Sequence, residues 1–402
     1  VLKNLDSFSS NPPRTKKNSH PQKDAAAHTV VAYTSYSATY RSNATGARMV
    51  TTADVYDTHV IFTQSFPDGA THTANGDRDS VLSAFPSFKV QALDDGAIGG
   101  TKRGYLQFAG DMVGSGFHVG EWSASSAGIG GGIKGTGPLC VFTADRQIAA
   151  VLSPFSNAMA ANQQFTPAEA AAGAAAGAGA ATLTYGVMGN VTAIPAGYAL
   201  STIVSFSAGS VNAALTRWGD VLLAEYGKSR DAAWQKDFAL QYLGYSTDNG
   251  AFYYYTTEQN KTYEQTMLDV HAYARREDIP YRYWLADSWW YFKGLRNGVK
   301  NWTAMPSVFP HGLAYVYEQT GWLVQGHNRY WSADTDYAAQ NGGKWRFLVD
   351  AEGSQYALPY DQGFWDYLMR TSREWGLTTY EQDWLDDEFD NFPPLTNSAT
   401  LG

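Results

Sequence analysis

The residues of this chain best suited to chemistry are acidic side chains that follow short apolar runs. The run at 377–383 reads Leu-Thr-Thr-Tyr-Glu-Gln-Asp, so Glu381 and Asp383 close a predicted strand. Three earlier runs end in a similar way, at Asp248, Asp287 and His327. Strand–helix barrels place their catalytic groups at the C-terminal ends of the strands. We therefore expect these four strand ends to meet at one mouth.

Asp383 is the candidate catalytic residue. Successive side chains of a strand point to opposite faces, so Asp383 should face the mouth while Gln382 and Trp384 turn away. An ionised carboxylate in that position can attack the anomeric carbon of a sugar as a nucleophile. The alternative is an aspartate that caps the following helix, because acidic residues continue at 386–388.

Six further residues are candidates for binding a sugar: Asp287, Trp289, Asp248, His327, Arg329 and Glu381. A carboxylate such as Asp287 accepts hydrogen bonds from sugar hydroxyls, and an indole such as Trp289 offers a flat apolar face. Ten of the thirteen tryptophans lie beyond residue 280, a distribution that is typical of carbohydrate sites. The alternative is structural, because large barrels also pack aromatic residues near strand ends.

Composition and motifs argue against other classes of function. The net charge of −9 without a basic patch argues against nucleic acid as a partner. No apolar run approaches the roughly 20 residues that a membrane-spanning helix needs. The sequence lacks a phosphate-binding glycine loop, a Gly-x-Ser-x-Gly nucleophile elbow and a zinc-ligand pattern, so no cofactor and no metal are expected.

The first half of the chain has the composition of a β domain. Residues 1–27 are polar and should form a mobile or surface-draped leader, whereas 28–208 contain many short runs of β-branched and aromatic residues. Strands without intervening helices indicate a large antiparallel β-sandwich. The stretch 166–181 departs from this pattern, because Thr166, Pro167 and Glu169 resemble a helix start.

The second half alternates between strands and helices. A helical linker is predicted over 209–240, with Ser210 as the N-cap of its first helix. Strands near 241–247, 281–287, 321–327 and 377–383 alternate with helices near 262–277, 311–319 and 361–375. This alternation indicates a parallel sheet. Residues 241–402 would then form the N-terminal half of an eight-stranded (β/α)8 barrel.

A half-barrel exposes sheet edges, so we expect the remaining strands to come from residues beyond 402 or from a partner chain. A homo-oligomer is one way to supply them. The first residue is Val1 rather than methionine, which suggests a processed chain or a piece of a longer one. Four Asn-x-Ser/Thr sequons, at Asn43, Asn190, Asn260 and Asn301, favour a secreted or cell-surface glycoprotein of eukaryotic origin. The single cysteine, Cys140, would also fit a cytosolic protein.

The layout of a sandwich, a linker and a barrel with acids at the second and fourth strands resembles the α-galactosidase and raffinose-synthase clan of retaining glycoside hydrolases. The second strand of that clan ends in Asp-Asp-Gly-Trp, and here the sequence is Ala286-Asp287-Ser288-Trp289. The fourth strand ends in Lys-x-Asp, and here it ends in Glu381-Gln382-Asp383. The phrase Gly137-Pro-Leu-Cys-Val-Phe also resembles the sandwich of uncharacterised eukaryotic members.

The resemblance implies that Asp383 is the nucleophile and Asp287 a hydroxyl ligand in a retaining, α-galactosidase-like hydrolase of α-linked sugars. Ala286 stands in place of one sugar-binding aspartate, and Glu381 stands in place of the lysine. A negative charge at Glu381 should raise the pKa of one or both neighbouring carboxyl groups. The clan's general acid comes from a sixth strand, outside this sequence.

Two functions remain open at this point. One is a glycoside hydrolase that acts on α-linked sugars. The other is a catalytically inactive, glycosidase-derived glycoprotein that serves as a structural or sugar-binding part of an extracellular assembly, because function does not follow from fold.

Overall fold

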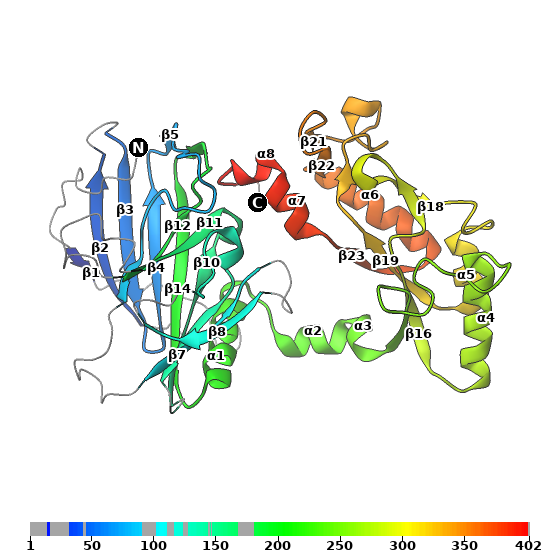
Figure 1. Cartoon of the computed structure of the whole chain (residues 1–402), viewed down its shortest axis with the longest axis horizontal. Coiled ribbons are helices and arrows are strands. Elements are labelled where there is room, and N and C mark those ends of the chain that lie inside the picture. Colours follow the sequence, from blue (N-terminus) through cyan, green and yellow to red (C-terminus); the bar gives the residue numbers. More distant parts are fainter. Residues whose placement is uncertain are drawn as a thin grey trace. The chain divides into compact units, whose positions relative to one another are not determined.

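The computed structural model describes residues 14–16, 32–42, 46–90, 102–110, 116–123, 128–143, 145, 147–167 and 181–400. Internal contacts divide the chain into two units (Figure 1): the first comprises 1–229 and 393–402, and the second comprises 230–392. The boundary at 229 falls inside the stretch that was expected to be a helical linker.

The first unit is built mainly of antiparallel strands. Its nine-stranded sheet has the order β1 (Arg14–Lys16), β2 (Thr34–Arg41), β3 (Arg48–Val55), β4 (His59–Phe66), β14 (Tyr198–Ala208), β10 (Ile148–Ser156), β9 (Leu139–Thr143), β7 (Arg103–Phe108) and β8 (Phe117–Glu121). A three-stranded sheet contains β11 (Ala161–Thr166), β12 (Ala181–Val187) and β6 (Ser87–Val90), and a small pair contains β13 (Ala193–Ile194) and β5 (Ala70–Thr71). The expectation of a largely β N-terminal region is confirmed.

Alternating side chains give the large sheet two apolar faces. Leu139 and Leu152 are buried with Leu183 of the three-stranded sheet, whereas Cys140 and Val151 are buried beneath helix α1 (Val211–Glu225). Helix α1 therefore packs on the sheet and belongs to the first unit. Its predicted N-cap is confirmed, because the Ser210 side chain accepts a hydrogen bond from the amide of the third helical residue.

One expectation for this unit is wrong. Residues 14–16, placed in the polar leader, form strand β1 and pair with β2. Thr166 ends β11, and residues 168–180 of the predicted helix lie outside the described residues. Among the described residues of this unit, the remaining regular elements are two short 3-10 helices, η2 (Ile133–Gly135) and η3 (Ala158–Ala160), and helix α8 (Pro393–Thr396).

The second unit contains a four-stranded parallel sheet in the order β15 (Leu243–Ser246), β16 (Tyr281–Ala286), β19 (Leu323–Asn328) and β23 (Leu377–Gln382). Helices α4 (Tyr263–Arg276), α5 (Leu313–Thr320) and α6 (Gln362–Ser372) connect these strands (Figure 1). The other helices are α2 (Arg230–Lys236), α3 (Phe238–Gln241), η5 (Leu295–Asn297), η6 (Ala339–Asn341), η7 (Arg373–Trp375) and α7 (Leu385–Asn391).

The ends of these helices follow from local chemistry. Thr262 and Gln265 form a reciprocal capping box at the start of α4, as their spacing predicts. Gly321 and Gly376 adopt φ values of 69° and 85°, the left-handed conformation that lets a helix stop and a strand begin. Strands β19 and β23 therefore start at defined residues, which also sets where their far ends, with His327 and Glu381, lie.

One face of the parallel sheet is packed against the three connecting helices. Trp284 and Val324 of the sheet share a buried cluster with Met267 of α4, Leu313 of α5 and Phe364 of α6. A five-stranded sheet was not predicted from the sequence. It comprises β17 (Tyr291–Lys293), β18 (Val299–Ala304), β20 (Trp331–Ser332), β22 (Tyr356–Pro359) and β21 (Phe347–Val349), all from connections after β16 and β19.

Strand β23 contains a bulge. Val324 pairs with Leu377, but the next residue, Gln325, pairs with Thr379, so Thr378 is an extra residue. A bulge of this kind shifts the alternation of side chains by one position. Leu377 consequently joins the helix-side cluster, while Glu381 lies on the opposite face. No described helix is both long and apolar enough to cross a membrane.

Acid is expected to destabilise the first unit through His59. This side chain is 6% exposed, stacks on Tyr56 at 4.3 Å, and has no described partner for Nε2. Burial lowers the pKa of His59 from 6.5 to about 4. Between pH 6.5 and about pH 4, His59 is therefore protonated in the unfolded chain but neutral in the folded chain. The free energy of unfolding should be at its full value above pH 6.5 and fall by about 1.4 kcal/mol per pH unit towards pH 4.

Chemical denaturation of the full chain at several pH values measures this slope. The matched variant is His59→Phe, which keeps an aromatic ring against Tyr56 but carries no titrating group. Its unfolding free energy should vary less steeply between the same pH values. Equal slopes for the two proteins would contradict the assignment.

Candidate functional site

The parallel register brings the predicted strand ends into one row. His327 pairs directly with Glu381. Ser246 pairs with Leu285, and Leu285 pairs with Gln325. These three residues lie two positions before Asp248, Asp287 and His327. Paired residues of adjacent strands lie on the same face of a sheet. Extended to the strand ends, this register forms one row, which we call the polar row: Asp248, Asp287, His327 and Glu381.

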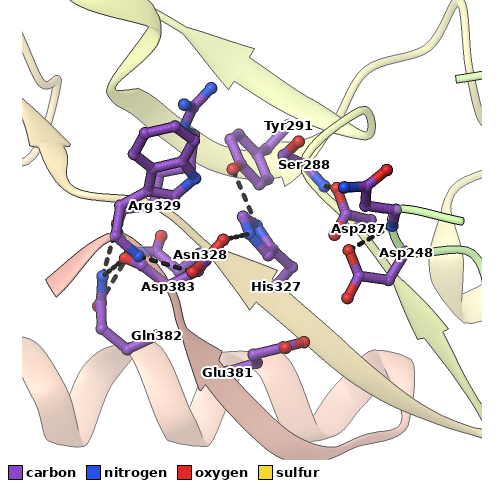
Figure 2. A network of polar contacts seen from close by, with 12 residues as sticks. Asp248, Asp287, Ser288, Tyr291, His327, Asn328, Arg329, Glu381, Gln382 and Asp383 are labelled. Carbon is purple, nitrogen blue, oxygen red and sulfur yellow. Dashed lines mark hydrogen bonds and ion pairs between the residues drawn. The ribbon is translucent and has the colours of Figure 1, made fainter. Parts of the chain in front are cut away.

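Asp383 lies two residues beyond Glu381, on the same side as the polar row, and binds His327. The distance between His327 Nε2 and Asp383 Oδ2 is 3.2 Å. The other ring nitrogen, Nδ1, lies 3.1 Å from the hydroxyl oxygen of Tyr291. Figure 2 shows the imidazole between these two partners. Because a carboxylate only accepts, the pattern fits an imidazole that donates from Nε2 to Asp383 and accepts the Tyr291 hydroxyl at Nδ1.

This contact keeps Asp383 ionised. The hydrogen bond from His327 lowers the pKa of Asp383 below its usual range, and the amide of Trp384 and the charge of Arg329 act in the same direction. The Trp384 amide donates to Asp383 Oδ1 over 2.8 Å. Trp384 itself is the N-cap residue of α7 and makes no side-chain cap bond. Asp383 therefore bonds the N-cap residue's own amide and does not cap the first turn of that helix.

Asp287 and Asp248 are neighbours at the other end of the polar row. Asp287 is 3% exposed, and burial raises its pKa, with the nearby carboxyl of Asp248 acting in the same direction. The amide of Ser288 donates to Asp287 Oδ1, and Asp248 Oδ1 accepts from the amide of Asn249. Figure 2 places the two carboxyl groups side by side. Of this pair, Asp287 is therefore the carboxyl group whose ionisation burial disfavours.

Glu381 occupies the position at which the sequence motif would carry a lysine. Its Oε2 accepts a hydrogen bond from Gln325 Nε2 over 3.2 Å. Burial raises the pKa of Glu381, and the charges of Asp248 and Asp287 raise it further. The expected rise in pKa thus falls on Glu381, whereas the pKa of Asp383 is lowered by the hydrogen bond from His327 and by the charge of Arg329.

Arg329 contributes a guanidinium group next to Asp383. Its Cζ lies 4.4 Å from the centre of the Trp384 ring and 5.5 Å from that of Tyr330. The buried Nε has no hydrogen-bond partner among the described residues. The group therefore retains donors for a bound molecule. Lys293, which is nearby in sequence to Asp287, donates from Nζ to the Tyr255 hydroxyl over 2.7 Å.

Trp289 is the one predicted sugar-binding residue that the structure removes from the site. It is 4% exposed and stacks on Tyr263 with ring centroids 3.5 Å apart and an interplanar angle of 8°. Its other neighbours include Trp284 and Phe309, so it has no free face for a sugar. The expectation was wrong because the chain turns directly after Asp287 and returns Trp289 to the helix-side core.

Three residues of the site were missed from sequence. Tyr291 binds His327, and Tyr255 binds the Ser288 hydroxyl at 2.6 Å. The charge of Asp287 acts on both Tyr254 and Tyr291. These tyrosines lie on turns and a short strand without a regular period, so no sequence pattern identifies them. The run Phe-Tyr-Tyr-Tyr at 252–255 is the only available signal.

The predicted glycosylation sequons differ in accessibility. Asn260 is exposed, whereas Asn190 is half-buried in a turn. Asn301 is half-buried on β18, where its Nδ2 donates to Asp336 and its Oδ1 accepts from Thr303 and Tyr337. Asn43 lies outside the described residues.

Sequence comparison does not identify a family. No known family model matches the chain, and no curated protein matches its sequence. In the described part of the chain, no group of three or more His, Cys, Asp or Glu side chains is arranged to hold a metal ion.

Solved structures give a likeness of fold. The chain is similar to the GH36 α-galactosidase AgaA of Geobacillus stearothermophilus, with a TM-score of 0.54 and 10% identity over 93% of this chain and 52% of that one. It is also similar to an α-galactosidase of Lactobacillus brevis, with a TM-score of 0.53 and 10% identity over 98% of this chain and 55% of that one. The chain therefore spans about half the length of these glycoside hydrolases and shares their fold over that part.

Replacing His327 with alanine should raise the pKa of Asp383, because the carboxylate loses the Nε2–H donor that favours its ionised form. Carbon-13 NMR titration of the aspartate carboxyl groups, with Asp383→Asn used for assignment, measures the change. His118→Ala, on β8 of the first unit, is the control and should leave the Asp383 pKa where it is. An unchanged pKa in His327→Ala would show that this contact does not set the ionisation of Asp383.

Proposed function

We propose that this chain is the sugar-binding and nucleophile-bearing part of a glycoside hydrolase that acts on α-linked sugars. One observation carries the proposal: Asp383 stands beside the polar row with its carboxylate held by His327 and its pKa lowered. The likeness of fold to two α-galactosidases supports it. Galactosides are accordingly the first substrates to test.

The proposed reaction proceeds in two steps with retention of configuration. In the first step, a carboxylate oxygen of Asp383 attacks the anomeric carbon, the bond to the leaving oxygen breaks, and a carboxylic acid gives that oxygen a proton. In the second step, the resulting carboxylate takes a proton from water, which attacks the anomeric carbon and releases Asp383. The two steps together consume one water and restore both carboxyl groups.

The groups around Asp383 suit this scheme. A nucleophile must be ionised when the sugar arrives, and the lowered pKa of Asp383 meets that condition. Asp248 and Asp287 can accept hydrogen bonds from sugar hydroxyls, and the guanidinium of Arg329 can donate them. We propose that the acid lies about 5–5.5 Å from Asp383, on residues that complete the mouth.

The parallel sheet gives a reason to expect such residues. Strands β15 and β23 are its two outer strands, so each has one edge without a partner strand in the described sheet. Leu285 and Leu323, on the face away from the helices, are only half-buried. We propose that further strands close this sheet into a barrel, whether from the same polypeptide, a partner chain or a second copy.

A second proposal concerns location. Asn260 lies on an exposed turn and would be accessible to a glycan, and this fits a secreted or cell-surface protein. Intact-mass measurement of the protein from its native source, before and after removal of N-linked glycans, tests it. An unchanged mass would contradict the proposal.

The alternative is a protein that binds sugar without cleaving it. The specific observation in its favour is Glu381, which places a further carboxyl where the sequence motif carries a lysine. In that case the polar row holds a sugar, but no glycosidic bond breaks. The experiment on Asp383 separates the two functions when binding and turnover are measured together.

Replacing Asp383 with alanine should reduce hydrolysis of aryl α-galactosides by at least about a thousandfold, because the bond-forming group is lost. The matched control is Asp386→Ala, an exposed acid on the first turn of α7, which should retain the wild-type rate. Azide can enter the space left by the carboxylate and should restore cleavage in Asp383→Ala by forming a glycosyl azide.

Retained turnover in Asp383→Ala would exclude it as the nucleophile. Wild-type protein that binds galactosides but cleaves none of them would favour the non-catalytic alternative. Both measurements should be made on the longest form of the protein in which the chain occurs, because the proposed acid lies on residues that complete the mouth.

A further inference from the structure

A pocket of about 240 Å³ lies in the second unit, away from the polar row, and is lined by Asp336, Tyr337, Lys344, Trp345 and Tyr367. Four of these residues lie between β20 and β21, and the fifth lies on α6.

The pocket is on the helix side of the parallel sheet. Trp345 and Tyr337 both contact Phe364 of α6, with ring centroids 6.3 Å and 5.3 Å apart. Helix α6 packs against the sheet face that carries Tyr380, because Trp365 contacts that ring at 5.7 Å. Glu381 is the next residue of the strand and faces the other way. The pocket is therefore separate from the proposed catalytic site.

Aromatic rings form the walls of the pocket. The rings of Trp345 and Tyr367 lie 5.6 Å apart with an interplanar angle of 34°. Both side chains are half-buried, so part of each ring is accessible. Flat apolar surfaces of this kind can pack against a face of a pyranose ring from which several C–H groups point.

Polar groups of opposite charge complete the lining. Asp336 is exposed, and one of its carboxylate oxygens, Oδ2, accepts a hydrogen bond from Asn301 Nδ2 over 3.2 Å. This contact orients the carboxylate and leaves Oδ1 available. The ammonium of Lys344 lies 5.1 Å from the centre of the Trp345 ring, on a flexible stem that can move aside. The Tyr337 hydroxyl is already engaged by Asn301 and by the amide of Trp302.

The charge balance and size indicate the class of ligand. A carboxylate and an ammonium in the same pocket offset each other, so neither a phosphate nor a cationic ligand finds a matching field. The volume is below the roughly 300–1,000 Å³ of sites for drug-sized molecules, which suits one small ring. An acceptor and a donor flanking two aromatic rings match a ring that carries several hydroxyl groups.

We propose that this pocket is an accessory site for a single neutral pyranose, such as the end of a glycan chain. The sugar ring lies against Trp345 and Tyr367, and its hydroxyls bond to Asp336 and Lys344. Such a site would hold a glycan on the protein independently of any cleavage at Asp383.

Saturation-transfer NMR with free D-galactose, D-glucose and D-mannose tests the proposal on the full chain. The background is Asp287→Asn, which removes a carboxylate acceptor and should weaken any sugar binding at the polar row. In this background, at least one of the three sugars should still bind. Trp345→Ala should weaken that binding about tenfold, because the larger ring surface is lost, whereas Trp234→Ala should leave it unchanged. Trp234 is 67% exposed on α2 and is the matched control.

Trp345 also packs against Phe364 of α6, so Trp345→Ala could weaken binding by destabilising the fold. Substitutions of the exposed side chains Asp336 and Lys344 avoid this problem. Asp336→Asn and Lys344→Ala should each weaken binding severalfold without lowering Tm. The proposal is overturned if none of the three sugars binds in the Asp287→Asn background. It is also overturned if the pocket variants bind as tightly as Trp234→Ala. Neither result depends on whether the chain cleaves glycosides.

Discussion

Four carboxyl groups stand close together at one end of the parallel sheet, and like charges held that close repel one another. The surroundings shift the pKa values of these groups in opposite directions. Burial raises the pKa of Asp287 and Glu381, whereas the hydrogen bond from His327 lowers the pKa of Asp383. His327 is therefore the contact on which the arrangement depends, because its donor favours the ionised form of Asp383 among carboxyl groups whose ionisation burial disfavours.

The aromatic cluster on the helix side holds His327 and its neighbours in place. Trp302 is buried and donates from Nε1 to the carbonyl oxygen of His327 over 2.9 Å, which fixes the end of β19. Trp290 packs on the same indole at 5.2 Å. Closely packed rings of this size leave little freedom for the strand to shift. Positions on the polar row are thereby set by side chains that no sugar would touch.

The sequence allowed the regular elements to be predicted well and the irregular ones poorly. The helix start at Ser210 and the capping box at Thr262 follow from local hydrogen bonding, which a short stretch of sequence encodes. The five-stranded sheet and Tyr291 depend on turns after β16 and β19, where no period is present. The clustering of tryptophans beyond residue 280 does not by itself indicate a sugar site, because six of these ten are buried in the core, including Trp289.

The irregular pairing inside two strands has a further consequence. In β23 the extra Thr378 allows Leu377 to face the helices and Glu381 to face away from them, although four residues separate the two. In β16 the pairing skips Arg282 in the same manner. In a strand without a bulge, residues an even number apart point to the same face of the sheet. An apolar residue at the start and an acidic residue four positions later could then not point to opposite faces. Each strand thus shifts its alternation of side chains once, at the unpaired residue. The residues before that shift can pack in the core, while those after it reach the polar row.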